Sequence, residues 1–282
     1  MNRLTIFAAW NQAKKELKNA GIDSYSFEAR QIIRHITGLD NAAIMAKYNE
    51  QLSPLQQTMY NDVLRRRASH YPLQYLLGEW SFYGLDFYVG EGVLIPRADT
   101  ETLVDAALDF LKERTSADVI DLCSGSGCIA VAVAKNSSAI VDALEKYDVP
   151  FSYLQRNIKR NGAEVTPIKE DVFAFIPDKK YDLVLSNPPY VSADEMDIID
   201  TETSHEPDTA LYGGEDGLSF YRFLAENWKK YIKTGGMLMF EVGFRQADAV
   251  SEIMRAAGFT DIGTREDAGG IQRVVFGTVK QL

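Results

Sequence analysis

The sequence predicts an α/β protein with a mostly parallel sheet that carries helices on both faces, preceded by a small helical domain. Two patterns lead to this prediction. After Thr100, short apolar segments rich in β-branched residues alternate with helical patterns, as in βαβ units. Before residue 70, apolar positions such as Ile6, Ala9, Ala13 and Leu17 recur instead at helical spacing.

The chain is expected to divide into three parts. We predict a helical domain over residues 1–75, a β-hairpin linker over 76–96 and an α/β domain over 97–282. The linker contains EWSFYGLDFYVGEGVLIP, a run of aromatic and β-branched residues broken by glycines, which is typical of a hairpin.

One helix of the first domain has a clear start and a charged end. Ser53-Pro54-Leu55-Gln56 combines a capping serine, a proline in the first helical position and a glutamine that completes a capping box. The helix runs into Arg65, Arg66 and Arg67. A solvated helix end with favourable positive charge explains this triplet most simply, and a site for an acidic partner is the alternative.

The α/β domain is expected to follow a regular order of elements. Because its strands alternate with helices, ligands are expected at the carboxyl ends of the strands. The expected strands cover residues 119–122, 139–144, 165–168, 181–186 and 237–242, with two more at the end of the chain, and the clearest helices cover 101–114, 219–232 and 246–257.

Composition excludes several classes of protein. The 282 residues are 46% hydrophobic and 25% charged, and no apolar run approaches the roughly 20 residues of a membrane span. Two cysteines form no disulfide framework, so we expect a cytoplasmic protein. The net charge of −10 disfavours direct binding to nucleic acid, because phosphate contacts usually require a basic face.

A glycine-rich loop follows the first strand of the α/β domain. The segment VIDLCSGSG ends in Gly125 and Gly127, which let a backbone approach a ligand closely. Glu145 closes the next strand, where a carboxylate can bind both hydroxyls of a ribose. Ala130 replaces the third glycine of a dinucleotide fingerprint, so an adenosyl group without phosphates fits better. A plain βα turn and an exposed carboxylate are the alternatives.

Asp171 follows the third strand and is a further candidate in the same region. Its carboxylate could accept a hydrogen bond from an adenine amino group. A helix or turn cap explains the residue equally well. His35, His70 and His205 do not cluster along the sequence, and we predict no metal site.

Asn187-Pro188-Pro189-Tyr190 is the most informative segment. It ends a buried strand, and its prolines fix the backbone into a rigid arm. An amide nitrogen is a poor nucleophile, and two acceptors aimed at its N–H bonds can hold it and help it pyramidalise. Asn187 Oδ1 and the Pro188 carbonyl can supply those acceptors, and Tyr190 can pack over the flat amide. A strand-ending turn with a capping asparagine is the alternative.

Nearly the whole chain resembles the release-factor glutamine methyltransferase family, also called HemK or PrmC. The resemblance rests on RRR, YPLQYLLGEWSFYGLDFYV, IPRADTE, DLCSGSGCIA, NPPYV, EPDTALYGGEDGL and FEVGFRQ. It implies a seven-strand Rossmann-like S-adenosylmethionine methyltransferase domain behind a helical domain that recognises the substrate. It also implies methyl transfer to the side-chain N5 of the glutamine in the Gly-Gly-Gln motif of class I peptide chain release factors.

The resemblance also assigns residues. Asn187, Pro188 and Tyr190 are the expected catalytic residues, and with Pro189 they are expected to hold the substrate. The residues expected at the cofactor are Asp121, Cys123, Ser124, Gly125, Gly127, Glu145, Asp171 and Asn187.

Two departures and two rival functions accompany the resemblance. Cys123 stands where many relatives have glycine, and KYDVPFSYLQRN after Glu145 replaces a segment usually rich in alanine. A glutamine methyltransferase of a ribosomal protein shares the Asn-Pro-Pro-Tyr, but Arg97, Thr100 and Glu101 favour the release factor. An adenine-N6 methyltransferase fits the same four residues, although it would have to extrude a base and bind phosphates.

Overall fold

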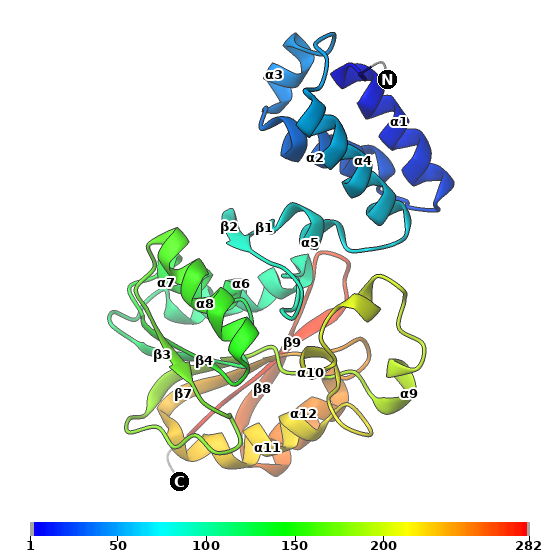
Figure 1. Cartoon of the computed structure of the whole chain (residues 1–282). Helices are drawn as coiled ribbons and strands as arrows, with labels where there is room; N and C mark the ends of the chain where they lie inside the picture. The colour runs from blue at the N-terminus through cyan, green and yellow to red at the C-terminus, as the bar shows by residue number, and fades with distance from the viewer. Residues whose placement is uncertain (1–2, 281–282) are drawn as a thin grey trace. The chain divides into compact units, whose positions relative to one another are not determined.

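The computed structural model describes residues 3–280 and divides into two compact units (Figure 1). The first unit contains the chain up to Gly78 together with Asp200–His205. The second contains Glu79–Ile199 and the chain from Glu206 onwards. A short segment that follows the Asn-Pro-Pro-Tyr arm in sequence therefore packs with the N-terminal helices. In residues 3–280, no helix is both long and apolar enough to cross a membrane.

The first unit is helical, as the apolar spacing predicts. Ser53 caps α4 through the predicted capping box, in which its hydroxyl accepts from Gln56 N at 3.2 Å and Gln56 Oε1 accepts from Ser53 N at 2.9 Å. The helices of this unit are α1 (Ile6–Asn19), α2 (Tyr25–Thr37), α3 (Asn41–Ala46), α4 (Pro54–Ala68) and α5 (Leu73–Leu77).

Arg67 corrects the interpretation of the arginine triplet as a solvated helix end. Its side chain is only 3% exposed, whereas that of Arg65 is 72% exposed. The Arg67 guanidinium forms a two-pronged ion pair with Glu28, with N–O distances of 2.5 and 3.0 Å, and a second ion pair with Glu202 at 2.9 Å. The acidic partners of this arginine thus lie within its own unit. Exposure decreases from Arg65 through Arg66 to Arg67 because successive helical residues point in different directions.

The second unit confirms the predicted α/β fold with a seven-stranded sheet in the order β5-β4-β3-β6-β7-β9-β8. The first five of these pair in parallel, and β9 runs antiparallel to both of its neighbours. The strands are β3 (Asp118–Leu122), β4 (Ile140–Glu145), β5 (Val165–Lys169), β6 (Tyr181–Ser186), β7 (Ile232–Glu241), β8 (Thr260–Glu266) and β9 (Gln272–Thr278).

Helices connect these strands and pack on them. The longer ones are α6 (Glu101–Leu111), α7 (Cys128–Asn136), α8 (Asp148–Asn161), α11 (Ser219–Trp228) and α12 (Ala247–Ala256). Short helical turns complete the unit: η1 (Ala98–Thr100), α9 (Ala193–Met196), α10 (Asp208–Leu211) and η3 (Lys229–Tyr231), while η2 (Thr203–His205) belongs to the first unit.

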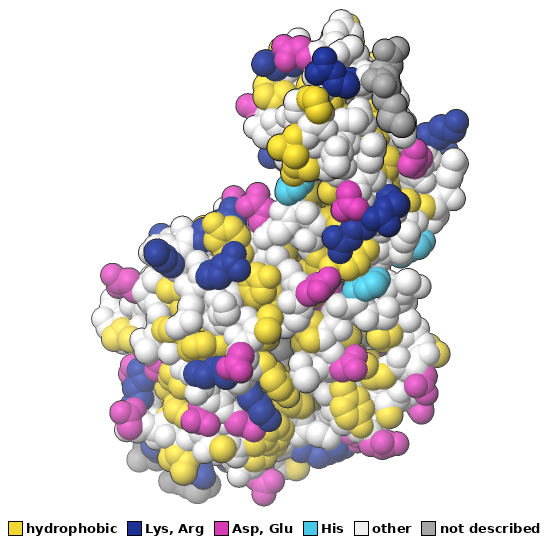
Figure 2. All heavy atoms as spheres, in the orientation of Figure 1, with side chains coloured by type: hydrophobic (Ala, Val, Ile, Leu, Met, Phe, Trp, Pro, Cys, Tyr) yellow, Lys and Arg dark blue, Asp and Glu magenta, His cyan; other side chains and the backbone are white. Residues whose placement is uncertain are grey.

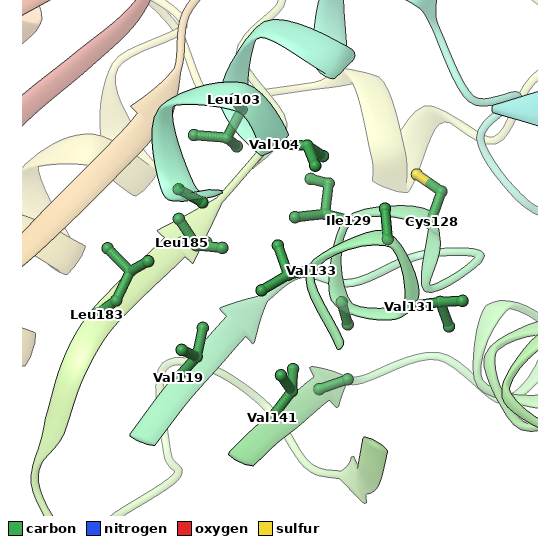
Figure 3. Close-up of a cluster of buried hydrophobic side chains, with 14 of the residues drawn as sticks. Leu103, Val104, Val119, Cys128, Ile129, Val131, Val133, Val141, Leu183 and Leu185 are labelled. Atoms are coloured by element: carbon green, nitrogen blue, oxygen red, sulfur yellow. The ribbon is translucent and has the colours of Figure 1, made fainter. Parts of the chain in front are cut away.

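Burial on both faces explains why the strands are continuously apolar. Alternate residues of one strand point to opposite sides, so Val119 joins one core cluster and Ile120 the other. Figure 3 shows Val119, Val141 and Leu183 of three adjacent strands facing Ile129 and Val133 of α7.

The strand order reverses at β3. The chain proceeds from β3 to β4 and β5 on one side of the sheet and then returns to β6 on the other side of β3. In such sheets a crevice opens outside the carboxyl ends of the strands at the reversal. The loop after β3 and the Asn-Pro-Pro-Tyr arm after β6 therefore leave the sheet side by side.

The aromatic segment forms the predicted hairpin, with β1 (Glu79–Phe82) paired to β2 (Leu85–Tyr88). Asn157 of α8 is fully buried and fastens this hairpin to the α/β unit. Its Oδ1 accepts from Tyr88 N at 2.7 Å, and its Nδ2 donates to Tyr88 O at 3.1 Å and to Ser126 O at 2.9 Å. One side chain thus links the hairpin to the glycine-rich loop.

Replacing Arg67 with alanine should destabilise the first unit by roughly 3–5 kcal/mol, because Glu28 would remain buried without its partner. Arg65→Ala is the matched control, since its exposed pair with Asp62 contributes about 1 kcal/mol or less. Urea unfolding of both variants measures the difference. Equal losses of stability in the two variants would contradict the role given to the Arg67 ion pairs.

Candidate active site

Three alternate residues of the loop after β3 adopt a left-handed backbone conformation. Cys123, Gly125 and Gly127 all have positive φ, of 62°, 54° and 81°. At Gly127 a Cβ would also lie 2.4 Å from Leu154 Cδ1, so both conformation and space require glycine there. α7 begins at the next residue, and the loop thereby brings backbone N–H groups to the carboxyl edge of the sheet.

Cys123 occupies the left-handed region that glycine normally fills. Glycine adopts this conformation freely, whereas a residue with a Cβ adopts it at a conformational cost. Burial raises the pKa of the Cys123 thiol well above its usual range. Burial likewise raises the pKa of Cys128, to about 12. Neither thiol has the character of a reactive nucleophile.

A pocket opens at this edge and gathers most of the predicted cofactor residues. Cys123, Ser124, Gly125, Glu145, Asp171, Asn187 and Pro189 line it. Four other predicted site residues, Asp121, Gly127, Pro188 and Tyr190, are not among the lining residues. Asp121 lies fully buried in β3, where burial raises its pKa to about 7.

Glu145 lies at the end of β4 with its carboxylate turned to the glycine-rich loop. Oε2 accepts from Gly125 N at 3.0 Å, and Oε1 accepts from Tyr147 N at 2.7 Å. Burial raises the pKa of Glu145 despite these hydrogen bonds. Each carboxylate oxygen can accept more than one hydrogen bond, so the group both fixes the loop and retains capacity for two hydroxyls in the pocket.

The segment after Glu145 forms α8 although it lacks the family's usual alanines. Pro150 stands in the first turn, where its missing N–H is no disadvantage, and both Pro150 and Tyr147 line the pocket. This segment therefore closes one side of the site.

Asp171 lines the pocket beside a group of aromatic rings. It accepts from Phe173 N at 3.0 Å and pairs with Lys146 at 2.9 Å. Burial pushes the pKa of Asp171 upward, but the hydrogen bonds from Lys146 and Phe173 N, together with the charge of Lys146, bring the pKa below its usual value. The Phe173 ring lies 5.1 Å from that of Phe220, which also lines the pocket. A flat, apolar group with a donor at its edge fits such a wall.

The Asn-Pro-Pro-Tyr arm is held rigidly against its surroundings. Gln246 Nε2 donates to Tyr190 O at 2.9 Å, and Gln246 Oε1 accepts from Gly243 N at 3.0 Å. A Cβ on Gly213 would lie 2.6 Å from Tyr190 Cα, and one on Gly217 would lie 2.3 Å from Tyr190 O. Burial raises the pKa of Tyr190 to about 12, so the ring stays neutral.

The chain after the arm returns to build another wall of the pocket. Glu206 is buried, accepts from Ile95 N at 3.0 Å and pairs with Arg97. Thr209 and Ala210, a few residues on, line the pocket together with Leu94 and Arg97. Sequence reasoning noted the stretch EPDTALYGG without giving it a role, because its contacts are with residues about a hundred positions earlier.

The sequence also did not indicate that two further residues beside the arm, Glu241 and Thr100, lie near each other. Glu241 ends β7, next to β6, and burial raises its pKa to about 7. Thr100 is buried at the start of α6 and lies 3.4 Å from Asn187 Nδ2 through its hydroxyl oxygen. Only the resemblance marked the segments that contain them. Glu101, the neighbour of Thr100, accepts from Tyr83 N at 2.7 Å and anchors the hairpin.

Comparison with known families matches both parts of the chain. Residues 8–78 match the model described as the PrmC N-terminal domain, and residues 99–205 match the methyltransferase small domain. The two matches together span the helical unit and the first half of the α/β unit.

Individual relatives extend over almost the full length. A release factor glutamine methyltransferase of Geobacter sulfurreducens is 38% identical over 277 residues, which cover 98% of this chain and 97% of that protein. One of Thermodesulfovibrio yellowstonii is 37% identical and covers 90% of this chain and 94% of that protein. A solved methyltransferase of Pyrococcus furiosus, 19% identical, has a TM-score of 0.55 over 71% of this chain and 92% of its own, which shows a shared fold.

Cys123→Gly should be more stable than Cys123→Ala by up to about 1 kcal/mol, because alanine keeps the left-handed strain while glycine removes it at a smaller entropic cost. Lys112, with φ of −51°, is the control position, and there the alanine variant should be the more stable one. Chemical denaturation of the four variants provides the comparison. An alanine variant as stable as the glycine variant at position 123 would show that no strain resides there.

Proposed function

Because this chain belongs to the release factor glutamine methyltransferase family, we propose that its substrate is the glutamine of the Gly-Gly-Gln motif in a class I peptide chain release factor. The chain is an S-adenosylmethionine-dependent methyltransferase that acts on the side-chain N5 of a protein glutamine. Translation termination takes place in the cytoplasm, which is therefore the compartment we propose for it.

The observation that carries the proposal is the placement of a rigid amide-bearing arm beside the pocket that the glycine-rich loop and Glu145 line. Asn187 and Pro189 line the pocket, while Pro188 and Tyr190 of the same arm do not. One part of the arm thus lines the pocket, while its other groups are left for contact with the substrate. A methyl donor in the pocket and a substrate glutamine held by the arm would meet at Asn187.

The pocket residues fit S-adenosylmethionine by their chemistry. The buried Glu145 carboxylate suits ribose hydroxyls, and Asp171 with the Phe173 and Phe220 rings suits an adenine. Cys123, Ser124 and Gly125 bring the loop backbone close, with Gly127 allowing the turn and Asp121 supporting it from the strand. When bound, this donor supplies an electrophilic methyl group on a sulfonium that leaves readily.

The arm's task is to hold the glutamine amide. Asn187 Oδ1 and the Pro188 carbonyl oxygen accept hydrogen bonds from its two N–H groups. These hydrogen bonds hold the nitrogen in line with the methyl group and favour pyramidal geometry at the nitrogen. S-adenosylmethionine bound in the pocket would supply its methyl group to the nitrogen held in this position. Pro189 keeps the arm stiff, and the neutral Tyr190 ring shields the flat amide from water.

The helical unit is the surface we propose for recognising the folded substrate. Several large apolar side chains are exposed on it, and Figure 2 shows apolar groups on its visible face. Phe7 and Tyr48 are 51% and 42% exposed, with ring centroids 5.8 Å apart, and Met45 on α3 is 60% exposed. An exposed aromatic pair of this kind is a typical anchor for a protein partner.

Incubation of the full-length enzyme with S-adenosylmethionine and intact release factor should methylate the glutamine of Gly-Gly-Gln, as located by peptide mass spectrometry. Asn187→Ala should reduce the rate by about 10²–10³ while donor affinity stays nearly unchanged, because one hydrogen-bonding group of the transition state is lost. Methylation found only on nucleic acid or on a ribosomal protein would reject the proposed substrate.

Glu145→Ala should weaken S-adenosylmethionine binding at least about tenfold, because charged hydrogen bonds of roughly 1.5–3 kcal/mol each would be lost. Glu164→Ala, an exposed carboxylate outside the pocket, is the control. Isothermal titration calorimetry measures both affinities. Unchanged binding in the Glu145 variant would remove the residue from the cofactor site.

Replacing Phe7 and Tyr48 together by serine should raise the KM for intact release factor at least about tenfold, as expected for an aromatic anchor. The variant should methylate a short Gly-Gly-Gln peptide as well as the unchanged enzyme does. Ile140→Ser, at the exposed first residue of β4 in the second unit, is the control. An unaltered KM for the intact factor would show that this aromatic pair takes no part in recognition.

A further inference from the structure

Glu241 is a buried acid that the proposed chemistry does not yet use. Only 2% of the residue is exposed, and in residues 3–280 no group donates a hydrogen bond to its Oε2. A carboxylate in such a position is expensive, and glutamine or an apolar side chain would satisfy the core at lower cost. The presence of an acid at this buried position therefore indicates a role beyond packing.

The register of the sheet brings Glu241 to the Asn-Pro-Pro-Tyr arm. Ser186 of β6 pairs with Phe240 of β7, so Asn187 and Glu241 are the next residues on two adjacent parallel strands. Thr100 joins them from a third element, the start of α6. Its hydroxyl accepts from Asn187 Nδ2 at 3.4 Å and lies close enough to the Glu241 carboxylate to lower the pKa of that group.

The direction of these hydrogen bonds follows from what each group can do. An ionised carboxylate only accepts, so the Thr100 hydroxyl must donate to Glu241 and turn a lone pair towards Asn187. Asn187 then satisfies that lone pair with its NH₂ group, and its Oδ1 faces the other way. An asparagine without this constraint could reverse its amide and present N–H groups to the N–H groups of the substrate.

We propose that Glu241 and Thr100 are positioning residues that fix the Asn187 amide so that its oxygen is presented to the substrate glutamine. This inference rests on the proposed function of Asn187 as an acceptor for the substrate amide. Glu241 acts through Thr100 and touches neither substrate nor donor. Thr100 itself lines the donor pocket, so its role must be separated from donor binding by measurement.

The protonation state of Glu241 determines whether the Thr100 hydroxyl donates to Glu241 or to Asn187. Burial raises its pKa to about 7, and the Thr100 hydroxyl, Arg273 and Arg97 oppose that rise. When protonated, Glu241 can donate to Thr100, which frees the threonine hydrogen to point at Asn187 and favours the reversed amide. The titratable or charged groups around Glu241 are Arg97, Asp99, Cys128, Tyr190, Tyr221 and Arg273.

Burial holds the pKa values of Tyr190, Tyr221 and Cys128 far above 7, whereas that of Glu241 lies near 7. Its folded pKa is raised, so it is protonated below about pH 7 and ionised above it. The rate of methyl transfer should therefore rise with pH through this region.

The test compares full-length enzymes on intact release factor, with kcat and KM measured across pH and donor affinity measured by calorimetry. Thr100→Val keeps the shape but removes the hydroxyl. It should lower kcat roughly 10- to 100-fold, as expected for a misplaced catalytic group, with donor affinity nearly unchanged. Thr100→Ser should restore most of kcat. Glu241→Gln should abolish the rise in kcat near pH 7, and Glu252→Gln, an exposed control on α12, should retain it.

Three results would overturn the proposal. One is a Thr100→Val enzyme with normal kcat and an unchanged pH profile. Another is a Thr100→Ser enzyme as slow as Thr100→Val. The third is a loss of donor affinity that accounts for the whole decrease, which would make Thr100 a donor-binding residue. The unchanged enzyme, assayed in parallel, tests the proposed function separately, because its methylation of the release factor does not depend on how these variants behave.

Discussion

The structure of the site depends on the close pairing of β3 with β6 at the carboxyl edge of the sheet. Ser186 Oγ donates to Leu122 O at 2.8 Å. Leu122 is the last residue before the glycine-rich loop, and Ser186 is the last residue before the Asn-Pro-Pro-Tyr arm. This buried hydrogen bond holds the two functional segments in a fixed relation. Because β3 is also where the strand order reverses, the crevice for a ligand opens at the same point.

Rigidity around this point has several independent sources. The prolines of the arm restrict its backbone, and Gln246 secures Tyr190 from the other side. Glycines at 213 and 217 allow the returning chain to pass within contact of the arm. On the donor side, Glu145 holds two backbone N–H groups of neighbouring loops. Methyl transfer requires mainly alignment of nitrogen, carbon and sulfur, and a preorganised site of this kind suits that requirement.

Local signals in the sequence predicted much of this arrangement. The alternation of apolar strands and helices predicted the fold, and the Ser53–Gln56 capping box predicted a helix start to the residue. The proposed site residues Glu145 and Asn187 lie at the end of β4 and directly after β6, at the edge where a parallel sheet places its ligands. β7 begins at Ile232, five residues before the predicted strand, and the sheet accommodates Gly235 and Gly236 through an irregular register with β6.

Long-range contacts account for what the sequence did not reveal. Arg67 finds Glu28 and Glu202 far away in sequence, and Glu206 finds Arg97 in the same way. The relation among Thr100, Asn187 and Glu241 likewise joins three elements that only the folded sheet brings together. No periodicity or motif spacing contains such information, and the left-handed backbone of Cys123 likewise became apparent only in the folded loop.

The central claim is that the Asn187 side-chain oxygen and the Pro188 carbonyl hold the substrate amide beside the methyl donor. A crystal structure of the enzyme with S-adenosylhomocysteine and an intact release factor tests it most directly. The account predicts the glutamine side-chain nitrogen at about 2.9 Å from both oxygens, with the cofactor sulfur on its open side. A glutamine bound away from Asn187, or an Asn187 amide that offers its nitrogen to the substrate, would contradict it.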